Sequence, residues 1–145
     1  MYLEPFSDKP SYPQVTPADN TSNMRGGTII RGYKIRQQGN QWQFLLIPNN
    51  NNNQPVARSI MYGSEKECEE GVKAFRRLVI ENNVDSLASP YITLEKQDKR
   101  LFLCYVVDGQ TILKAGTYEN KQNCRKSVKA ICKYIDEYTL HKLYN

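Results

Sequence analysis

Five basic residues near the C-terminal end of the chain are spaced in a way that could bind an anion. Four of them recur at every fourth position and the fifth stands beside them: Lys121, Arg125, Lys129, Lys133 and Lys126. Residues four apart share one face of an α-helix, so these side chains would form a cationic stripe. Such a stripe could bind the phosphates of a nucleic acid or an acidic protein partner. It is the candidate anion-binding or partner-binding face of the protein.

The same stripe has a simpler interpretation, in which it only keeps the exposed face of a helix solvated. The preceding predicted helix starts with Glu65, Glu67, Glu69 and Glu70, and the cations could face these carboxylates. The two interpretations differ in whether the cations converge on an open surface or pair with Glu69 and Glu70. Nucleic-acid binding, in particular, would show as an affinity that falls steeply with salt.

Residues suited to catalysis or metal binding are few. The four cysteines form no C-x-x-C pair and the chain has a single histidine, His141, so a Cys/His zinc site is not expected. Gly26-Gly27 lacks the lysine and the helix of a phosphate-binding loop. Cys68 lies near a predicted helix start, where a thiolate is favoured, but the sequence identifies no basic partner for it. We predict that the protein is not an enzyme and binds no metal or cofactor.

A repeat at a fixed offset organises the chain. Residues 54–74 match residues 110–130 at an offset of 56, for example in the pairs Gln54/Gln110, Tyr62/Tyr118, Cys68/Cys124 and Val72/Val128. Self-similarity at such a period indicates two copies of one supersecondary unit. Each copy is small for an independent domain, so the two are expected to share one core.

Each unit is predicted to hold three strands and one helix. In the first unit, alternating apolar residues predict a hairpin over residues 33–47 with its turn at 38–40, and a third strand over 56–61. Ser64 and Glu67 fit a capping box that starts a helix ending near residues 81–83.

The second unit follows the same course, with turns at residues 98–99 and 108–109 and a helix capped by Asn120. The two helices carry matching apolar stripes, Cys68, Val72, Phe75 and Val79 in the first and Cys124, Val128, Ile131 and Ile135 in the second. Three strands with one apolar face need a cover, which the helix of each unit supplies.

The predicted fold is α+β. Two tandem β-β-β-α repeats, residues 33–83 and 91–140, are expected to share one six-stranded antiparallel sheet with both helices on one face and pseudo-two-fold symmetry. Residues 31–145 would form this one domain, behind a flexible Pro/Asn/Ser-rich tail over residues 1–30. A monomer is expected, because the second copy supplies the sheet edge that a dimer would otherwise offer.

Tyr62 and Tyr118 stand at equivalent positions just before the two helix caps. We expect each ring to close over the corner between strand and helix, with the hydroxyl reaching a backbone group. Stacking on a base or on another ligand is the functional alternative.

Composition and charge are those of an ordinary globular protein. The net charge is +5, and residues 91–145 carry most of it, with ten Lys/Arg against six Asp/Glu. The longest apolar runs, residues 44–47 and 101–107, are too short to span a membrane. The N-terminal residues lack the basic start and apolar stretch of an export signal, which predicts a cytoplasmic protein.

The sequence resembles the YegP-like family, also described as domain of unknown function 1508. The residues that carry the resemblance are Gln54-Pro55-Val56-Ala57 and Tyr62-Gly63-Ser64-Glu65-Lys66-Glu67-Cys68-Glu69-Glu70-Gly71-Val72. It covers about residues 33–82 and, more faintly, 91–135, where Ser127 replaces Gly71 and Asn120 replaces Ser64. The resemblance implies tandem repeats in a shared-sheet α+β fold. It implies no activity and supplies no site residues, because the family is uncharacterised.

These observations predict an uncharacterised, non-enzymatic binding or interaction module of the YegP-like type. It would work through its sheet face or the surface of its second helix, on a partner that the sequence does not specify and that could be a protein. The alternative is a basic nucleic-acid-associated protein that uses the cationic face of the second helix. A small enzyme with an unrecognised site ranks third.

Overall fold

The computed structural model describes residues 30–49, 54–136 and 140–143. The predicted tail covers residues 1–30, and residues 1–29 of it lie outside the described part of the chain. The first described residue, Ile30, already belongs to a strand.

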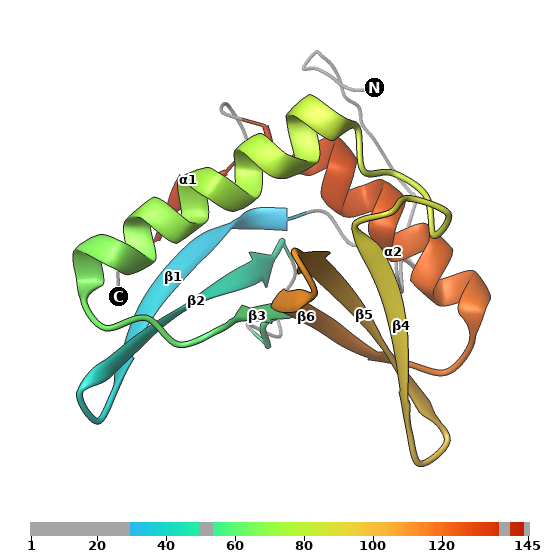
Figure 1. Cartoon of the computed structure of the whole chain (residues 1–145), viewed down its shortest axis with the longest axis horizontal. Helices are drawn as coiled ribbons and strands as arrows, with labels where there is room; N and C mark the ends of the chain where they lie inside the picture. The colour runs from blue at the N-terminus through green and yellow to red at the C-terminus, as the bar shows by residue number, and fades with distance from the viewer. Residues whose placement is uncertain (1–29, 50–53, 137–139, 144–145) are drawn as a thin grey trace.

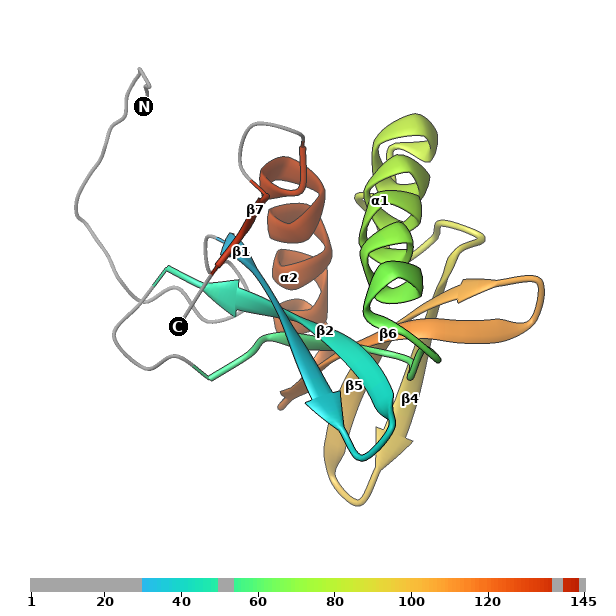
Figure 2. The ribbon, with the colours of Figure 1, turned by 90° about the vertical axis from the view of Figure 1, so that its left-hand side faces the viewer.

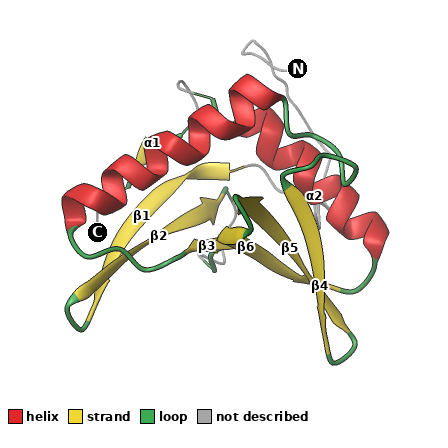
Figure 3. Ribbon diagram, in the orientation of Figure 1, coloured by secondary structure: helices red, strands yellow, loops and turns green. Residues whose placement is uncertain are grey.

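The chain runs three strands and a helix, then three strands and a helix, and ends in a short strand. The elements are β1 (Ile30–Gln38), β2 (Gln41–Pro48), β3 (Ala57–Ser59), α1 (Glu65–Asn82), β4 (Ile92–Gln97), β5 (Arg100–Val107), β6 (Gln110–Tyr118), α2 (Lys121–Tyr134) and β7 (His141–Lys142). All the strands form one sheet in the order β4-β5-β6-β3-β2-β1-β7. Both helices lie on the same side of this sheet, as Figures 1 and 3 show.

The prediction of six antiparallel strands is wrong, because over the described residues the sheet has seven strands and is mixed. The added strand, β7, runs parallel to β1, with Gly32 paired to His141 and Tyr33 to Lys142. Glycine is needed at position 32, since a Cβ there would collide with the His141 carbonyl. His141, the single histidine of the chain, therefore lies in a strand at the edge of the sheet. The pseudo-two-fold symmetry and the division into two repeats stay predictions.

The structure confirms the predicted N-terminal caps of both helices. The Ser64 hydroxyl accepts a 3.1 Å hydrogen bond from the Glu67 amide, and the Asn120 side chain accepts one of 2.9 Å from the Asn123 amide. The Glu67 carboxylate accepts from the Gly63 amide at 3.1 Å, one residue before the cap that the sequence indicated. These bonds satisfy amides that a helix start leaves without partners.

One core lies between the helices and the sheet. The predicted apolar stripes of both helices are buried in it. The Phe75 ring of α1 packs against Phe44 of β2 at 6.2 Å and edge-on against Tyr105 of β5 at 5.0 Å. Phe75 thus joins strands from both halves of the sheet.

Strands β3 and β6 join the two halves. Ala57 pairs with Ala115, Arg58 with Lys114 and Ser59 with Leu113, in antiparallel register. Arg58 and Lys114 are equivalent positions at the offset of 56, so the register is symmetric about this pair. β3 is shorter than the strand predicted over residues 56–61.

The two tyrosines close the strand-to-helix corners in different ways. The Tyr118 hydroxyl shares a 2.5 Å hydrogen bond with the Ser127 hydroxyl of α2. The Tyr62 ring lies over Gly71, the equivalent residue of α1, where a Cβ would collide with it. The prediction that the Tyr118 hydroxyl bonds to a backbone group is therefore wrong, because its partner is the side chain of Ser127.

Tyr118 makes the fold sensitive to alkali. Burial raises the pKa of its hydroxyl to about 12, although the bond to Ser127 opposes this rise. An unfolded tyrosine ionises near pH 10, so its contribution to stability is complete below about pH 10 and is lost as the pH rises through about 12. We expect Tyr118→Phe to remove up to about 2–3 kcal/mol of the alkaline loss in unfolding free energy.

Urea unfolding of the two proteins between about pH 8 and 12 measures this difference. Part of the alkaline loss should remain in the variant, because burial also raises the pKa of Tyr105 well above its usual value. An unchanged pH profile in Tyr118→Phe would contradict the assignment.

Candidate anion-binding site on helix α2

The structure exposes all five predicted cations on α2 but brings only three of them together. Lys121, Arg125 and Lys129 line a surface pocket of about 570 Å³. Lys126 and Lys133 do not line it, and the Lys133 ammonium lies 5.3 Å from the centre of the Tyr134 ring. The stripe is therefore divided into a convergent set and a separate pair.

The rest of the pocket is formed by the connection between α1 and β4, by Leu94 of β4 and by Val128 of α2. Its other lining residues are Asp85, Ser86, Leu87, Ala88, Leu94 and Val128. Leucine, valine and alanine give the pocket an apolar wall beside the three cations. This combination suits a ligand that carries an acidic group next to an apolar one.

Local structure holds the connection in place. Asn83 ends α1 in the left-handed conformation, with φ at 47°. Val84 is buried and donates its amide to the Val79 carbonyl at 3.1 Å. Ser86 then closes a turn, because its hydroxyl accepts from the Ala88 amide at 3.1 Å. The wall opposite α2 is thus built from a capped helix end and a hydrogen-bonded turn.

The three convergent cations have no carboxylate partner among the described residues. Arg125 donates to the Gln122 side chain at 3.3 Å, which leaves its charge uncompensated. The first turn of α2 also contains no acidic residue. Cations at a helix start oppose the helix dipole, and three of them line a pocket that has one carboxylate, that of Asp85. The lining therefore carries a net positive charge, which favours an anion.

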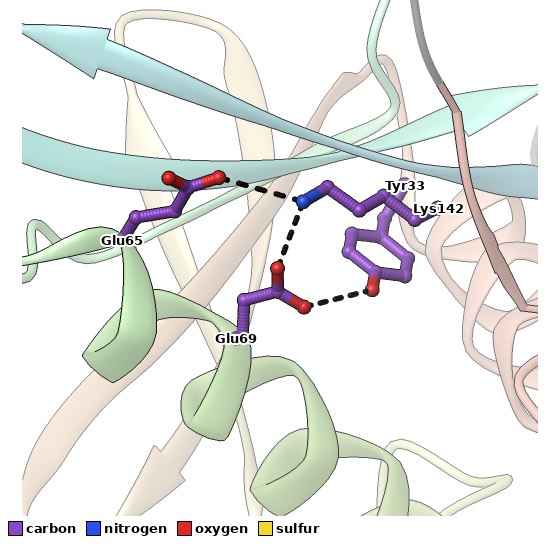
Figure 4. A network of polar contacts seen from close by, with 4 residues as sticks. All are labelled: Tyr33, Glu65, Glu69 and Lys142. Carbon is purple, nitrogen blue, oxygen red and sulfur yellow. Dashed lines mark hydrogen bonds and ion pairs between the residues drawn. The ribbon is translucent and has the colours of Figure 1, made fainter.

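The acidic start of α1 does not neutralise these cations. Its carboxylates bind Lys142 of β7, at 3.4 Å from Glu65 and 2.8 Å from Glu69, and Glu69 also accepts from the Tyr33 hydroxyl at 3.5 Å (Figure 4). Glu70 pairs with Lys73 at 3.8 Å. Figure 1 shows the first turns of α1 and α2 at opposite ends of the helix layer. The alternative in which the cations of α2 pair with Glu69 and Glu70 is therefore not observed.

Thiol chemistry has little support. Cys68 is fully buried, and burial, reinforced by Glu69 and Glu65, raises its pKa to about 11. A catalytic cysteine needs the opposite shift of its pKa.

Among the described residues, no group of three or more His, Cys, Asp and Glu side chains could hold a metal ion. None of the helices in the described part of the chain is long and apolar enough to cross a membrane.

The sequence predicts the cations of the pocket but not its walls. The connection over residues 85–88 has no periodic signal, and only the tertiary structure brings it beside α2. Arg58 and Lys114, the facing basic pair at the junction of β3 and β6, were also not among the predicted site residues. The signal that could have indicated them is that both are basic and lie at equivalent positions of the repeat, 56 residues apart.

Comparison with known proteins supports the fold and leaves the function open. No protein-family model matches the sequence, and no curated protein matches it. The structure is similar to that of yegP from E. coli, a protein of unknown function, with a TM-score of 0.59 and 14% identity over 79% of this chain and 93% of that one. It is also similar to the UPF0339 protein SO3888 from Shewanella oneidensis, with a TM-score of 0.57 and 14% identity over 77% of this chain and 89% of that one. The resemblance to YegP-like proteins is thus confirmed as a likeness of fold.

Proposed function

We propose that this chain is a non-enzymatic binding module with two tandem β-β-β-α repeats, and that its working surface is the α2 pocket. Its partner would be a protein segment with acidic side chains next to an apolar one. The symmetric register of β3 and β6 supports the duplicated architecture. A cytoplasmic monomer remains our expectation for the intact protein.

One observation carries the proposal, namely that Lys121, Arg125 and Lys129 meet on a pocket with an apolar wall. Cations that only keep a helix solvated do not need to line the same pocket. Leu87 and Leu94, which are half-buried, would contact the apolar side chain, and the cations at the rim would bind the carboxylates beside it. The volume of about 570 Å³ is within the range of ligand sites.

Two charge-reversal variants of α2 test this assignment. Arg125→Glu/Lys129→Glu changes the pocket, while Lys126→Glu/Lys133→Glu makes the same change of charge on the same helix outside the pocket. We expect the first pair to weaken the binding of peptides with a Glu/Asp-Leu-Glu/Asp pattern by about tenfold or more, and the control pair to change it much less. Fluorescence anisotropy with labelled peptides gives both dissociation constants.

Nucleic-acid binding is the second candidate, and the same variants separate it from the first. Phosphate contacts are weakened roughly uniformly by the loss of any cation, and the affinity falls steeply with salt. Equal losses in the two variants on duplex or single-stranded oligonucleotides, without peptide binding, would therefore favour that alternative. Peptide binding that both variants retain would remove the α2 pocket as the working surface.

A further inference from the structure

Two basic side chains face each other on the side of the sheet that the helices leave uncovered. Arg58 of β3 pairs directly with Lys114 of β6. Their strand neighbours Ala57, Leu113 and Ala115 are buried in the core beneath the helices. Side chains alternate along a strand, so Arg58 and Lys114 point to the opposite face. Figure 2 shows both helices on the other side of the sheet.

Like charges directly opposite each other destabilise an antiparallel pair. Lys114 is compensated, since its ammonium lies 2.8 Å from the Glu95 carboxylate and 5.0 Å from the centre of the Phe102 ring. Arg58 is exposed and has no partner among the described residues. The junction of the two halves thus holds a guanidinium that no described carboxylate balances.

The same two residues line a hollow of about 400 Å³. Its walls also include Pro55, Ile60 and Phe102, which supply apolar surface. Gln43, a further lining residue, is fixed in place, because its side chain accepts from Arg36 at 2.6 Å and donates to the Ser59 carbonyl at 2.9 Å. The hollow is therefore partly preformed, and at its edge lies the Arg58 guanidinium, which no carboxylate of the described residues balances.

We infer that this hollow at the β3–β6 junction binds a small organic phosphate. The planar guanidinium of Arg58 can donate two parallel hydrogen bonds to one phosphate. The organic part of the ligand would pack against Pro55, Ile60 and Phe102. A volume of about 400 Å³ is near the lower end of small-molecule sites, which favours a ligand of mononucleotide size over a polymer.

Titration of the ¹⁵N-labelled protein with adenosine monophosphate tests the inference. We expect saturable amide shifts at the residues that line the hollow, and weaker shifts at the same residues with inorganic phosphate. Arg58→Gln should raise the dissociation constant for adenosine monophosphate by about tenfold or more, because it removes a charge-assisted contact. The variant should fold, since the substitution is on the surface and removes a like-charge pair.

Arg77→Gln provides the matched control, because Arg77 is an exposed arginine of α1 outside the hollow. It should leave the affinity unchanged. Three results would each overturn the inference: no saturable shift at the junction with either probe, the same dissociation constant in Arg58→Gln and the unmodified protein, or shifts confined to α2. The α2 pocket is lined by other residues, so failure here would not bear on the proposed peptide site.

Discussion

Replacing Phe75 by alanine is expected to lower the free energy of unfolding by about 3–5 kcal/mol. The ring is 1% exposed and packs against Phe44 in the first half of the sheet and Tyr105 in the second. Its removal would leave a cavity where both halves meet, so the loss includes the burial of the ring and the contacts of its neighbours. Urea unfolding followed by circular dichroism measures the change.

Ile80 of the same helix supplies the control, because its side chain is 48% exposed. Ile80→Ala should change the free energy of unfolding by no more than about 0.5 kcal/mol. A loss in Ile80→Ala as large as that in Phe75→Ala would contradict the assigned role of the Phe75 ring, because Ile80 is half-exposed and alanine favours a helix more than isoleucine does. A loss below about 1 kcal/mol in Phe75→Ala would contradict the described packing at the centre of the core.

Gly71→Ala is expected to destabilise the protein by about 1–3 kcal/mol, although the substitution is usually favourable inside a helix. The reason is the Tyr62 ring, which lies where the new Cβ would be placed. Either the ring or the helix must shift, and the strain of that shift exceeds the gain in helical propensity of about 1 kcal/mol. Thermal or urea unfolding of the variant gives the sign directly.

The double variant Tyr62→Ala/Gly71→Ala isolates the cause. With the ring removed, adding the Gly71 substitution should stabilise the protein by about 0.5–1 kcal/mol, so that its effect changes sign between the two backgrounds. A stabilising effect of Gly71→Ala in the presence of Tyr62 would show that the ring does not press on this position. The corner of α2 cannot show the same reversal, because Ser127 there already bears a side chain bonded to Tyr118.

Local patterns in the sequence predicted the parts of the fold that depend on near neighbours. The caps at Ser64 and Asn120 and the turns at residues 98–99 and 108–109 occur where the sequence placed them. The apolar stripes of the helices are buried because a spacing of three and four residues aligns side chains on one face, whatever lies opposite. The cations of the candidate site were predicted by the same rule.

The parts that the sequence could not predict depend on residues that are distant along the chain. Strand β7 is two residues long, which is too short for any alternation, and its place is set by Gly32 and by the ion pairs of Lys142. Lys121, Arg125 and Lys129 line a pocket with the connection over residues 85–88, while Lys126 does not. The spacing of the cations in the sequence does not predict this division. That division follows from how α2 is rotated on the sheet, which its packing against β5 and β6 decides.

The pairing of β7 with β1 has a consequence for the order in which the protein is synthesised. Gly32 and His141 pair directly although they are roughly 110 residues apart in the sequence, and such distant contacts form late. A ribosome releases β1 early, so this strand keeps an unpaired edge until residue 142 has emerged. Unpaired edges are templates for association with other chains. The nascent protein is therefore exposed to aggregation through β1 in the interval before β7 has left the ribosome.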